Sequence, residues 1–136
     1  MIASNHSYKT KDPRKILVTW FSQAGHTERM GKVLADSFRR RGMEVESGDV
    51  RHIDPASLGD LDCIVVGAPV FYYDAPLYIQ DWLRGLPRIE GVPVAAYATY
   101  GGTGHNQHNT ACTLLELLVE KGGVPAGLAT FGKMST

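Results

Sequence analysis

Apolar and polar residues follow two different periods along this chain. Some short segments are almost continuously apolar or alternate every second residue, which predicts β-strands; they cover residues 14–21, 43–50, 63–67, 92–98 and 124–131. Longer segments repeat apolar residues every three or four positions, which predicts amphipathic helices; they cover residues 27–41, 76–86 and 106–121. Segments 14–21 and 63–67 read as central strands covered on both faces, whereas 43–50 alternates with charged residues as an edge strand does.

The ends of the helical segments carry the expected signals. Arg39, Arg40 and Arg41 precede Gly42, so the first helix ends with positive charge in its last turn and a glycine just beyond it. We interpret the three arginines as a solvated helix terminus rather than an anion-binding patch. Residues 54–58 open with Asp-Pro, which predicts a capped short turn with proline at its first helical position.

Apolar strands that alternate with amphipathic helices predict an α/β fold with a parallel sheet and right-handed crossovers. A chain of 136 residues predicts one domain. Residues 1–13 are polar and read as a flexible N-terminal tail, and residues 14–136 read as the folded domain. The composition, 43% hydrophobic and 21% charged, supplies enough apolar material for a core.

Charge and cysteine usage narrow the class of protein. The 14 basic and 14 acidic residues balance, so nothing indicates a nucleic-acid or membrane-surface partner. Cys63 and Cys112 are isolated and form no metal-ligand set, and we expect both to be small buried residues. The N-terminus lacks an apolar signal segment, and no apolar run is long enough to span a bilayer. We therefore expect a cytoplasmic protein in a reducing compartment.

The loop after the first strand, residues 22–27, has the sequence Ser-Gln-Ala-Gly-His-Thr. It lies between a buried strand and the start of a helix, where free N–H groups and the helix dipole favour a phosphate. Gly25 allows the backbone to approach a ligand closely. Ser22 and Thr27 offer hydroxyls, and Thr27 could also cap the helix. The alternative is an ordinary strand-to-helix turn without a ligand.

Two further loops add complementary chemistry. The segment after the third strand carries three consecutive aromatic residues at 71–73, which are flat stacking surfaces. The segment 99–104 combines Tyr100 with glycines whose backbone can meet the polar edge of a ring. Loops that leave the C-terminal ends of parallel strands lie at one edge of the sheet. The three loops therefore predict one site for a flat heteroaromatic ligand that carries a phosphate.

With these motifs the chain resembles flavodoxin-like domains over residues 14–131. The phosphate loop of that family reads approximately T/S-x-T-G-N-T, which Ser22, Gly25 and Thr27 match, whereas Ala24 replaces a hydroxyl residue and His26 replaces an asparagine. His26 can still donate through a ring nitrogen. The resemblance implies FMN as cofactor and a three-layer fold with a five-stranded parallel sheet in the order 2-1-3-4-5. Flavodoxins carry a final helix after the fifth strand, so we expect either a truncated domain or a homodimer that covers the exposed face.

The resemblance assigns cofactor contacts to all three loops. The phosphate loop comprises Ser22, Gln23, Ala24, Gly25, His26 and Thr27. The residues expected to flank the isoalloxazine ring or contact its pyrimidine edge are Pro69, Val70, Phe71, Tyr72, Tyr73, Thr99, Tyr100, Gly101, Gly102 and Gly104. Backbone groups of these last two loops would tune the flavin by hydrogen bonds.

No residue reads as a catalytic acid or base. Asp74 and Asp81 read as a solvated loop charge and a helix-surface charge rather than acid or base groups. His105 and His108 are three residues apart, and no third metal ligand is evident near them. The sequence therefore favours an electron-transfer protein or redox domain and leaves open whether it is a carrier or an FMN-dependent oxidoreductase.

The partner and two other functions stay open at this point. Residues 67–73 and 98–104 are similar to flavodoxin domains fused to an iron–sulfur ferredoxin, although this chain has no cluster cysteines. We expect a redox partner protein, ferredoxin-type for example, or a small electron acceptor. The alternatives are an NAD(P)H-dependent quinone or flavin reductase of the same fold and a degenerate interaction domain without cofactor. A phospho-receiver module is disfavoured because the first and third strands do not end in acidic residues.

Overall fold

Five parallel strands form a single sheet in the computed structural model, which describes residues 15–23, 25–70, 74–100 and 107–132. The strands are β1 (Lys15–Trp20), β2 (Glu44–Asp49), β3 (Cys63–Pro69), β4 (Pro93–Tyr100) and β5 (Val124–Gly132). Their order is β2-β1-β3-β4-β5, and every neighbouring pair is parallel. The predicted α/β class, strand order and edge position of β2 are confirmed. The predicted tail, residues 1–13, lies outside the described residues.

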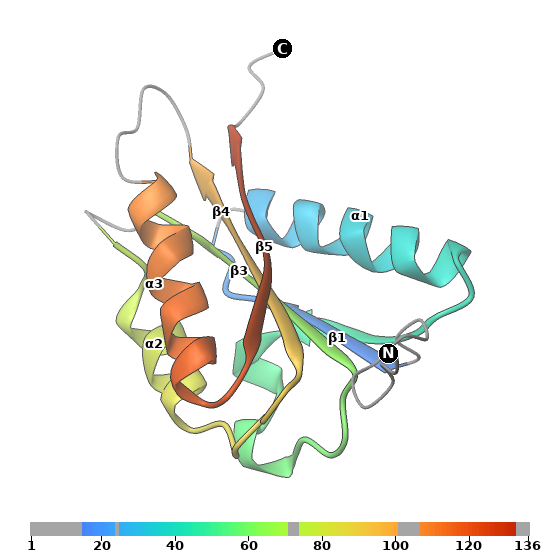
Figure 1. The fold of residues 1–136 in the computed structure, drawn as a ribbon. Coiled ribbons are helices and arrows are strands. Elements are labelled where there is room, and N and C mark those ends of the chain that lie inside the picture. Colours follow the sequence, from blue (N-terminus) through green and yellow to red (C-terminus); the bar gives the residue numbers. More distant parts are fainter. Residues whose placement is uncertain (1–14, 24, 71–73, 101–106, 133–136) are drawn as a thin grey trace, which may run out of the picture.

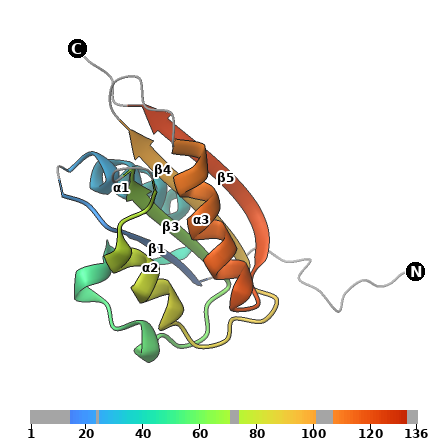
Figure 2. The ribbon, with the colours of Figure 1, turned by 90° about the vertical axis from the view of Figure 1, so that its left-hand side faces the viewer.

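Helices cover the sheet from both sides. They are α1 (His26–Arg40), α2 (Leu77–Arg84) and α3 (Gln107–Glu120). Helix α1 lies on one face, and α2 and α3 lie together on the other (Figures 1 and 2). Between β2 and β3 the described chain makes two 3-10 turns, η1 (Val50–His52) and η2 (Pro55–Ser57). The Asp54 carboxylate accepts a hydrogen bond from Ala56 N at 3.0 Å, so η2 is the capped turn that the sequence predicted.

Two clusters of buried side chains fill the spaces between these layers. Successive strand residues point to opposite faces of a sheet. Ile16 and Val18 of β1 therefore pack in the cluster beneath α1, whereas Leu17 packs in the cluster beneath α2 and α3. All three side chains are fully buried. Burial on both faces explains why the sequence of β1 is almost continuously apolar.

Two strands extend further toward their C-terminal ends than the sequence pattern predicted. Pro69 is the last residue of β3 rather than a loop residue, and it pairs in register with Thr99. Thr99 and Tyr100 likewise belong to β4, and Tyr100 pairs with Gly132 of β5. The pattern missed these positions because Pro and Thr interrupt the apolar run, while the sheet register continues through them. These candidate site residues are thus held by the sheet.

Burial differs from the prediction in α3 and at both cysteines. Val119 of α3 is 41% exposed, although we expected it on the inner side. The buried stripe of α3 instead includes Leu117 and Leu118, which leaves Val119 turned toward the outside. Cys63 and Cys112 are free thiols that are half-buried, not fully buried. Burial nevertheless raises the pKa of the Cys63 thiol.

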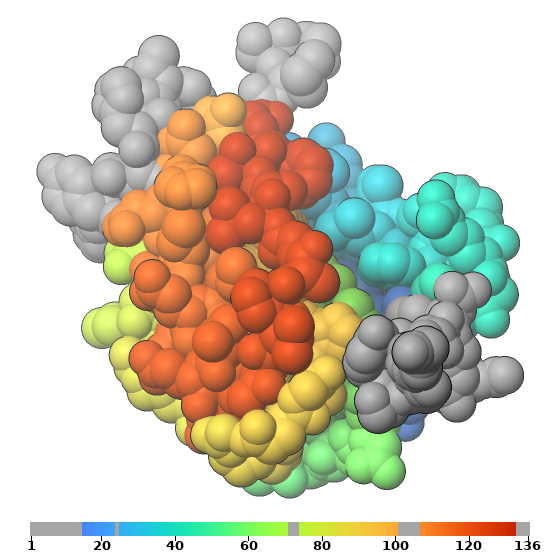
Figure 3. All heavy atoms as spheres, in the orientation of Figure 1, coloured from blue at the N-terminus to red at the C-terminus, as the bar shows by residue number. Residues whose placement is uncertain are grey.

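Strand β5 forms the edge of the sheet opposite β2 and lies on the molecular surface beside α3 (Figure 3). Its first four residues are exposed, and Leu128 to Phe131 are half-buried. Ala129 and Phe131 of β5 pack on the face of the sheet that α1 covers, and α1 is the helix that the described residues place on this face. None of the described helices has the length and apolar character of a transmembrane span.

Candidate functional site

The C-terminal ends of β1, β3 and β4 meet at one edge of the sheet. Trp20 at the end of β1 pairs with Gly67 of β3, and Pro69 at the end of β3 pairs with Thr99 of β4. The N–H of Val70 also donates to the Thr99 carbonyl oxygen at 3.0 Å. The three segments that the sequence singled out therefore leave the sheet at the same edge.

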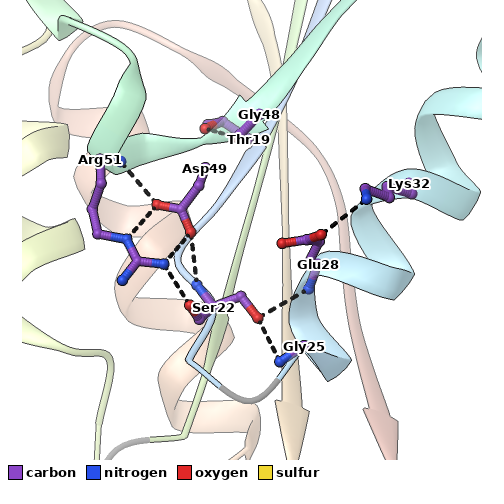
Figure 4. Close-up of polar contacts among 8 residues, drawn as sticks. All are labelled: Thr19, Ser22, Gly25, Glu28, Lys32, Gly48, Asp49 and Arg51. Carbon is purple, nitrogen blue, oxygen red and sulfur yellow. Dashed lines mark hydrogen bonds and ion pairs between the residues drawn. The ribbon is translucent and has the colours of Figure 1, made fainter.

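Ser22 organises the loop that joins β1 to α1. Its Oγ accepts hydrogen bonds from Gly25 N at 3.1 Å and from Glu28 N at 3.3 Å (Figure 4). Gly25, which stands just before α1, has φ 93° in the left-handed region and no side chain to cap the helix. Ser22 supplies the capping oxygen instead, so the prediction that Thr27 caps the helix is wrong. Ser22 Oγ already satisfies these two N–H groups, so an anion at the start of α1 would meet the Ser22 hydroxyl and the positive end of the helix dipole.

The Thr27 side chain points into the molecule. Thr27 and Thr99 are each 2% exposed, and their hydroxyl oxygens lie 2.7 Å apart. The hydroxyl of Tyr97, on β4, donates to the Thr27 carbonyl oxygen at 2.9 Å. These bonds fasten the first turn of α1 to β4. Sequence reasoning missed Tyr97, although an aromatic residue among the alanines of β4 was a signal of a special packing role.

Gln23 and His26 complete the described part of this loop. Gln23 is exposed and His26 is half-buried. His26 is the first residue of α1, and its Nε2 is buried without a hydrogen-bond partner in the described structure. A buried polar atom normally has a partner. This nitrogen is therefore available to a ligand at the start of α1.

Asp49 and Arg51 form a charge pair beside the loop, in which the aspartate is buried and the arginine is exposed. Asp49 is the last residue of β2 and is 8% exposed, and its Oδ2 lies 2.8 Å from Arg51 Nη2. Burial raises the pKa of the Asp49 carboxyl. The hydrogen bonds from Arg51 and from Ser22 N together outweigh burial, and the pKa is lowered from its ordinary value. The sequence analysis did not select either residue.

The lowered pKa of Asp49 makes stability depend on pH in acid. In the unfolded chain this carboxyl has its ordinary pKa of 3.8, so its contribution is full above pH 3.8 and is lost as the pH falls through the lower folded-state value. We expect the urea midpoint of the native chain to fall more steeply below pH 3.8 than that of Asp49→Asn. Asp36→Asn removes an exposed ion pair with Arg39 and should keep the steep fall. Parallel curves for native chain and Asp49→Asn would contradict this expectation.

An aromatic and cationic stack lies next to the same loop. Phe21 stacks on Tyr78 with ring centroids 5.6 Å apart, and the Arg51 guanidinium carbon lies 4.9 Å from the Phe21 ring centroid. Tyr78 is 49% exposed and its neighbour Leu77 is 74% exposed. The sequence analysis pointed instead to the aromatic residues 71–73. A stack of this kind stabilises the position of Arg51 over the end of β1.

Several predicted site residues lie outside the described part of the chain. They are Ala24, Phe71, Tyr72, Tyr73, Gly101, Gly102 and Gly104. Their proposed contacts stay predictions.

The acidic candidates have local partners, and so does His108, whose Nε2 lies 3.4 Å from Cys112 Sγ, whereas His105 lies outside the described residues. Asp74 Oδ1 accepts from Ala75 N at 2.7 Å, and Asp81 forms an exposed ion pair with Arg84. Within the described ranges no group of three or more histidine, cysteine, aspartate or glutamate side chains is placed to hold a metal ion.

A hollow of about 440 Å³ lies at the other end of the sheet, before β3 and β4. Its lining includes Asp60, Asp62, Arg88 and Glu90. Arg88 already has partners there, because it forms an ion pair with Glu90 and donates a hydrogen bond to the Glu120 carbonyl oxygen. None of the predicted site residues lines this hollow, so the candidate site stays at the C-terminal edge.

Comparisons with known proteins agree with this geometry. No family model matches the chain. A flavodoxin from Clostridium saccharobutylicum is 28% identical over 126 residues, which is 90% of this chain and 79% of that flavodoxin. The crystal structure of oxidised flavodoxin 2 from Bacillus cereus superposes with a TM-score of 0.74 at 24% identity and covers 86% of this chain and 84% of that one. Rubredoxin oxygen:oxidoreductase from Desulfovibrio gigas matches with a TM-score of 0.75 at 22% identity, over 90% of this chain and 31% of that one. By strand order and structural similarity, this chain has a flavodoxin-like α/β fold, and its sequence is similar to that of a flavodoxin.

Proposed function

We propose that this chain binds FMN at the C-terminal edge of β1, β3 and β4 and serves as an electron-transfer protein or redox domain. The observation that carries the proposal is the start of α1, where Gly25 N and Glu28 N converge on the Ser22 hydroxyl directly after a central strand. The similarity to a flavodoxin supports the same cofactor.

The residues of the loop fit a phosphate. A hydroxyl oxygen has two lone pairs and one proton. Ser22 Oγ uses its lone pairs to accept two N–H bonds, so its proton stays free to donate to a phosphate oxygen. The unpartnered Nε2 of His26 offers a second polar contact at the same helix start. A Cβ at Gly25 would meet nothing within 4 Å, so the backbone here is open to a ligand.

The chain's own residues bind and orient the cofactor, and FMN supplies the electron-transfer chemistry. We place the flavin ring between the segments that follow β3 and β4. Pro69 and Tyr100 are the half-buried last residues of those strands and would stand at the base of the ring site. The hydroxyl pair of Thr27 and Thr99 keeps the phosphate loop attached to β4, and this attachment holds the two halves of the site together.

We further propose a redox partner protein or a small electron acceptor. The match to one part of the larger Desulfovibrio gigas protein supports a domain that works beside another redox centre. A ferredoxin-type partner and a homodimer are the specific forms of this proposal. A cytoplasmic location is also part of it, because Cys63 and Cys112 are both free thiols.

Titration with flavins tests the proposed cofactor. We expect the chain to quench FMN fluorescence on binding, and Ser22→Ala to bind FMN about 10- to 100-fold more weakly, because a hydrogen bond to a charged group contributes about 1.5–3 kcal/mol. Riboflavin, which lacks the phosphate, should lose much less affinity.

A matched control is Ser57→Ala, which removes a hydroxyl that donates to the Asp54 carbonyl oxygen in an exposed turn. This variant should bind FMN like the native chain. Unchanged FMN fluorescence with the native chain would reject the cofactor and leave the degenerate interaction domain. Oxidation of NADPH by the FMN-loaded chain would support the reductase alternative.

A further inference from the structure

Asp49 and Arg51 together hydrogen-bond to both backbone polar groups of Ser22 (Figure 4). Asp49 Oδ2 accepts a hydrogen bond from Ser22 N at 3.2 Å, and Arg51 Nη2 donates to the Ser22 carbonyl oxygen at 2.6 Å. We infer that Asp49 and Arg51 are positioning residues for the phosphate loop, which they lock in a binding-ready conformation before any ligand arrives. This inference rests on the proposed FMN function. We call the two side chains together with the Ser22 backbone the Ser22 clamp.

The register of the sheet builds the clamp. Asp49 pairs with Trp20 across β2 and β1, so its carboxylate stands beside the chain as it leaves β1. The η1 turn follows at once and returns Arg51 toward the same point, where its guanidinium lies over Phe21. Asp49 Oδ1 accepts from both Arg51 N at 2.9 Å and Arg51 Nε at 2.8 Å, and Arg51 Nη2 meets Oδ2 at 2.8 Å. Both side chains therefore have a single well-defined geometry.

The clamp acts on the phosphate loop through one residue. Both backbone polar groups of Ser22 are occupied by the clamp, which fixes the direction of its side chain. That side chain in turn holds the N–H groups of Gly25 and Glu28. Arg51 donates through Nε and Nη2, a forked arrangement that lysine cannot reproduce. A loop that is ordered in advance loses less conformational entropy on binding, so its ligand binds more tightly.

Variants that change the charge of the clamp differently can distinguish a positioning role from a direct electrostatic effect on FMN binding. Asp49→Asn removes a negative charge beside a phosphate, and electrostatics alone would then strengthen FMN binding. Arg51→Lys keeps the positive charge, and electrostatics alone would leave binding unchanged. A positioning role requires the opposite results, because each variant breaks the clamp.

We would titrate FMN and riboflavin into the native chain, Asp49→Asn and Arg51→Lys. The expected result is about a tenfold rise in the FMN dissociation constant for both variants, with a change of less than about twofold for riboflavin. Asp36→Asn is the matched control, because it removes an aspartate that pairs with Arg39 on the exposed face of α1, and it should bind like the native chain. Tighter or unchanged FMN binding by Asp49→Asn overturns the inference, as does an equal loss for both flavins.

Amide hydrogen exchange without flavin tests the clamp independently of the cofactor. We expect the amides of Gly25 and Glu28 to exchange at least about tenfold faster in Asp49→Asn than in Asp36→Asn, because they lose a fixed acceptor. Equal exchange rates would overturn the clamp even if FMN binds. A native chain that binds no FMN would instead overturn the proposed function and the clamp's role in phosphate binding, whatever the exchange rates are.

Discussion

Replacing Gly67 with alanine should destabilise the domain by about 3 kcal/mol, the upper end of the usual cost of overpacking a core. An added Cβ would lie 1.9 Å from Cζ of Tyr97 and within 2.4 Å of the flanking ring carbons. The two residues pair in register on β3 and β4, so the Tyr97 ring lies directly across the glycine. The ring cannot easily swing away, because its hydroxyl donates to the Thr27 carbonyl oxygen.

Urea unfolding followed by circular dichroism measures this effect. Gly127→Ala is the matched control, since its Cβ would make an ordinary contact 3.5 Å from the Ala95 Cβ on the same sheet. The double variant Gly67→Ala/Tyr97→Leu should lose less stability than the sum of the single variants, because the smaller side chain relieves the clash. A Gly67→Ala chain with an unchanged urea midpoint would show that Tyr97 does not lie across Gly67.

The sequence predicted the layers of the fold because periodicity is a local property. The apolar run of β1 and the stripe of α1 are each visible within about 15 residues, and the α/β alternation then restricts the topology to a few arrangements. That the three loops lie at one edge of the sheet could be predicted from the parallel arrangement of the strands alone. The ends of β3 and β4 were harder to predict from the sequence, because Pro69 and Thr99 extend their strands by pairing with each other.

The contacts that shape the site depend on residues distant in sequence. Tyr97 reaches the Thr27 carbonyl oxygen across 70 positions, and the Ser22 clamp requires the register between β1 and β2. The choice of cap illustrates the same limit. Both Ser22 and Thr27 carry a hydroxyl near the start of α1, and local rules favoured Thr27. Its side chain instead bonds to Thr99, so Ser22 supplies the cap.

Gly31→Ala should reverse the usual effect of replacing a glycine in a helix. Alanine is normally more stable than glycine in a helix interior by about 1 kcal/mol. Here an added Cβ would lie 2.2 Å from Cε3 of Trp20 and 2.8 Å from the Tyr97 hydroxyl oxygen. Both side chains are buried beneath α1, so the helix itself would have to move away from the sheet. We expect a net loss of about 2 kcal/mol, since the cost of overpacking exceeds the gain in helix propensity.

The loss in Gly31→Ala has a specific consequence for the site. Lifting α1 would stretch the hydrogen bond from Tyr97 to the Thr27 carbonyl oxygen, which fastens the first turn of the helix to β4. FMN affinity should therefore fall together with the urea midpoint. In Asp49→Asn, by contrast, FMN affinity should fall by more than the loss of folding stability accounts for. Gly59→Ala is the control, because a Cβ there meets nothing within 4 Å. A Gly31→Ala chain more stable than the native protein would mean that α1 does not rest on Trp20 as closely as these distances require.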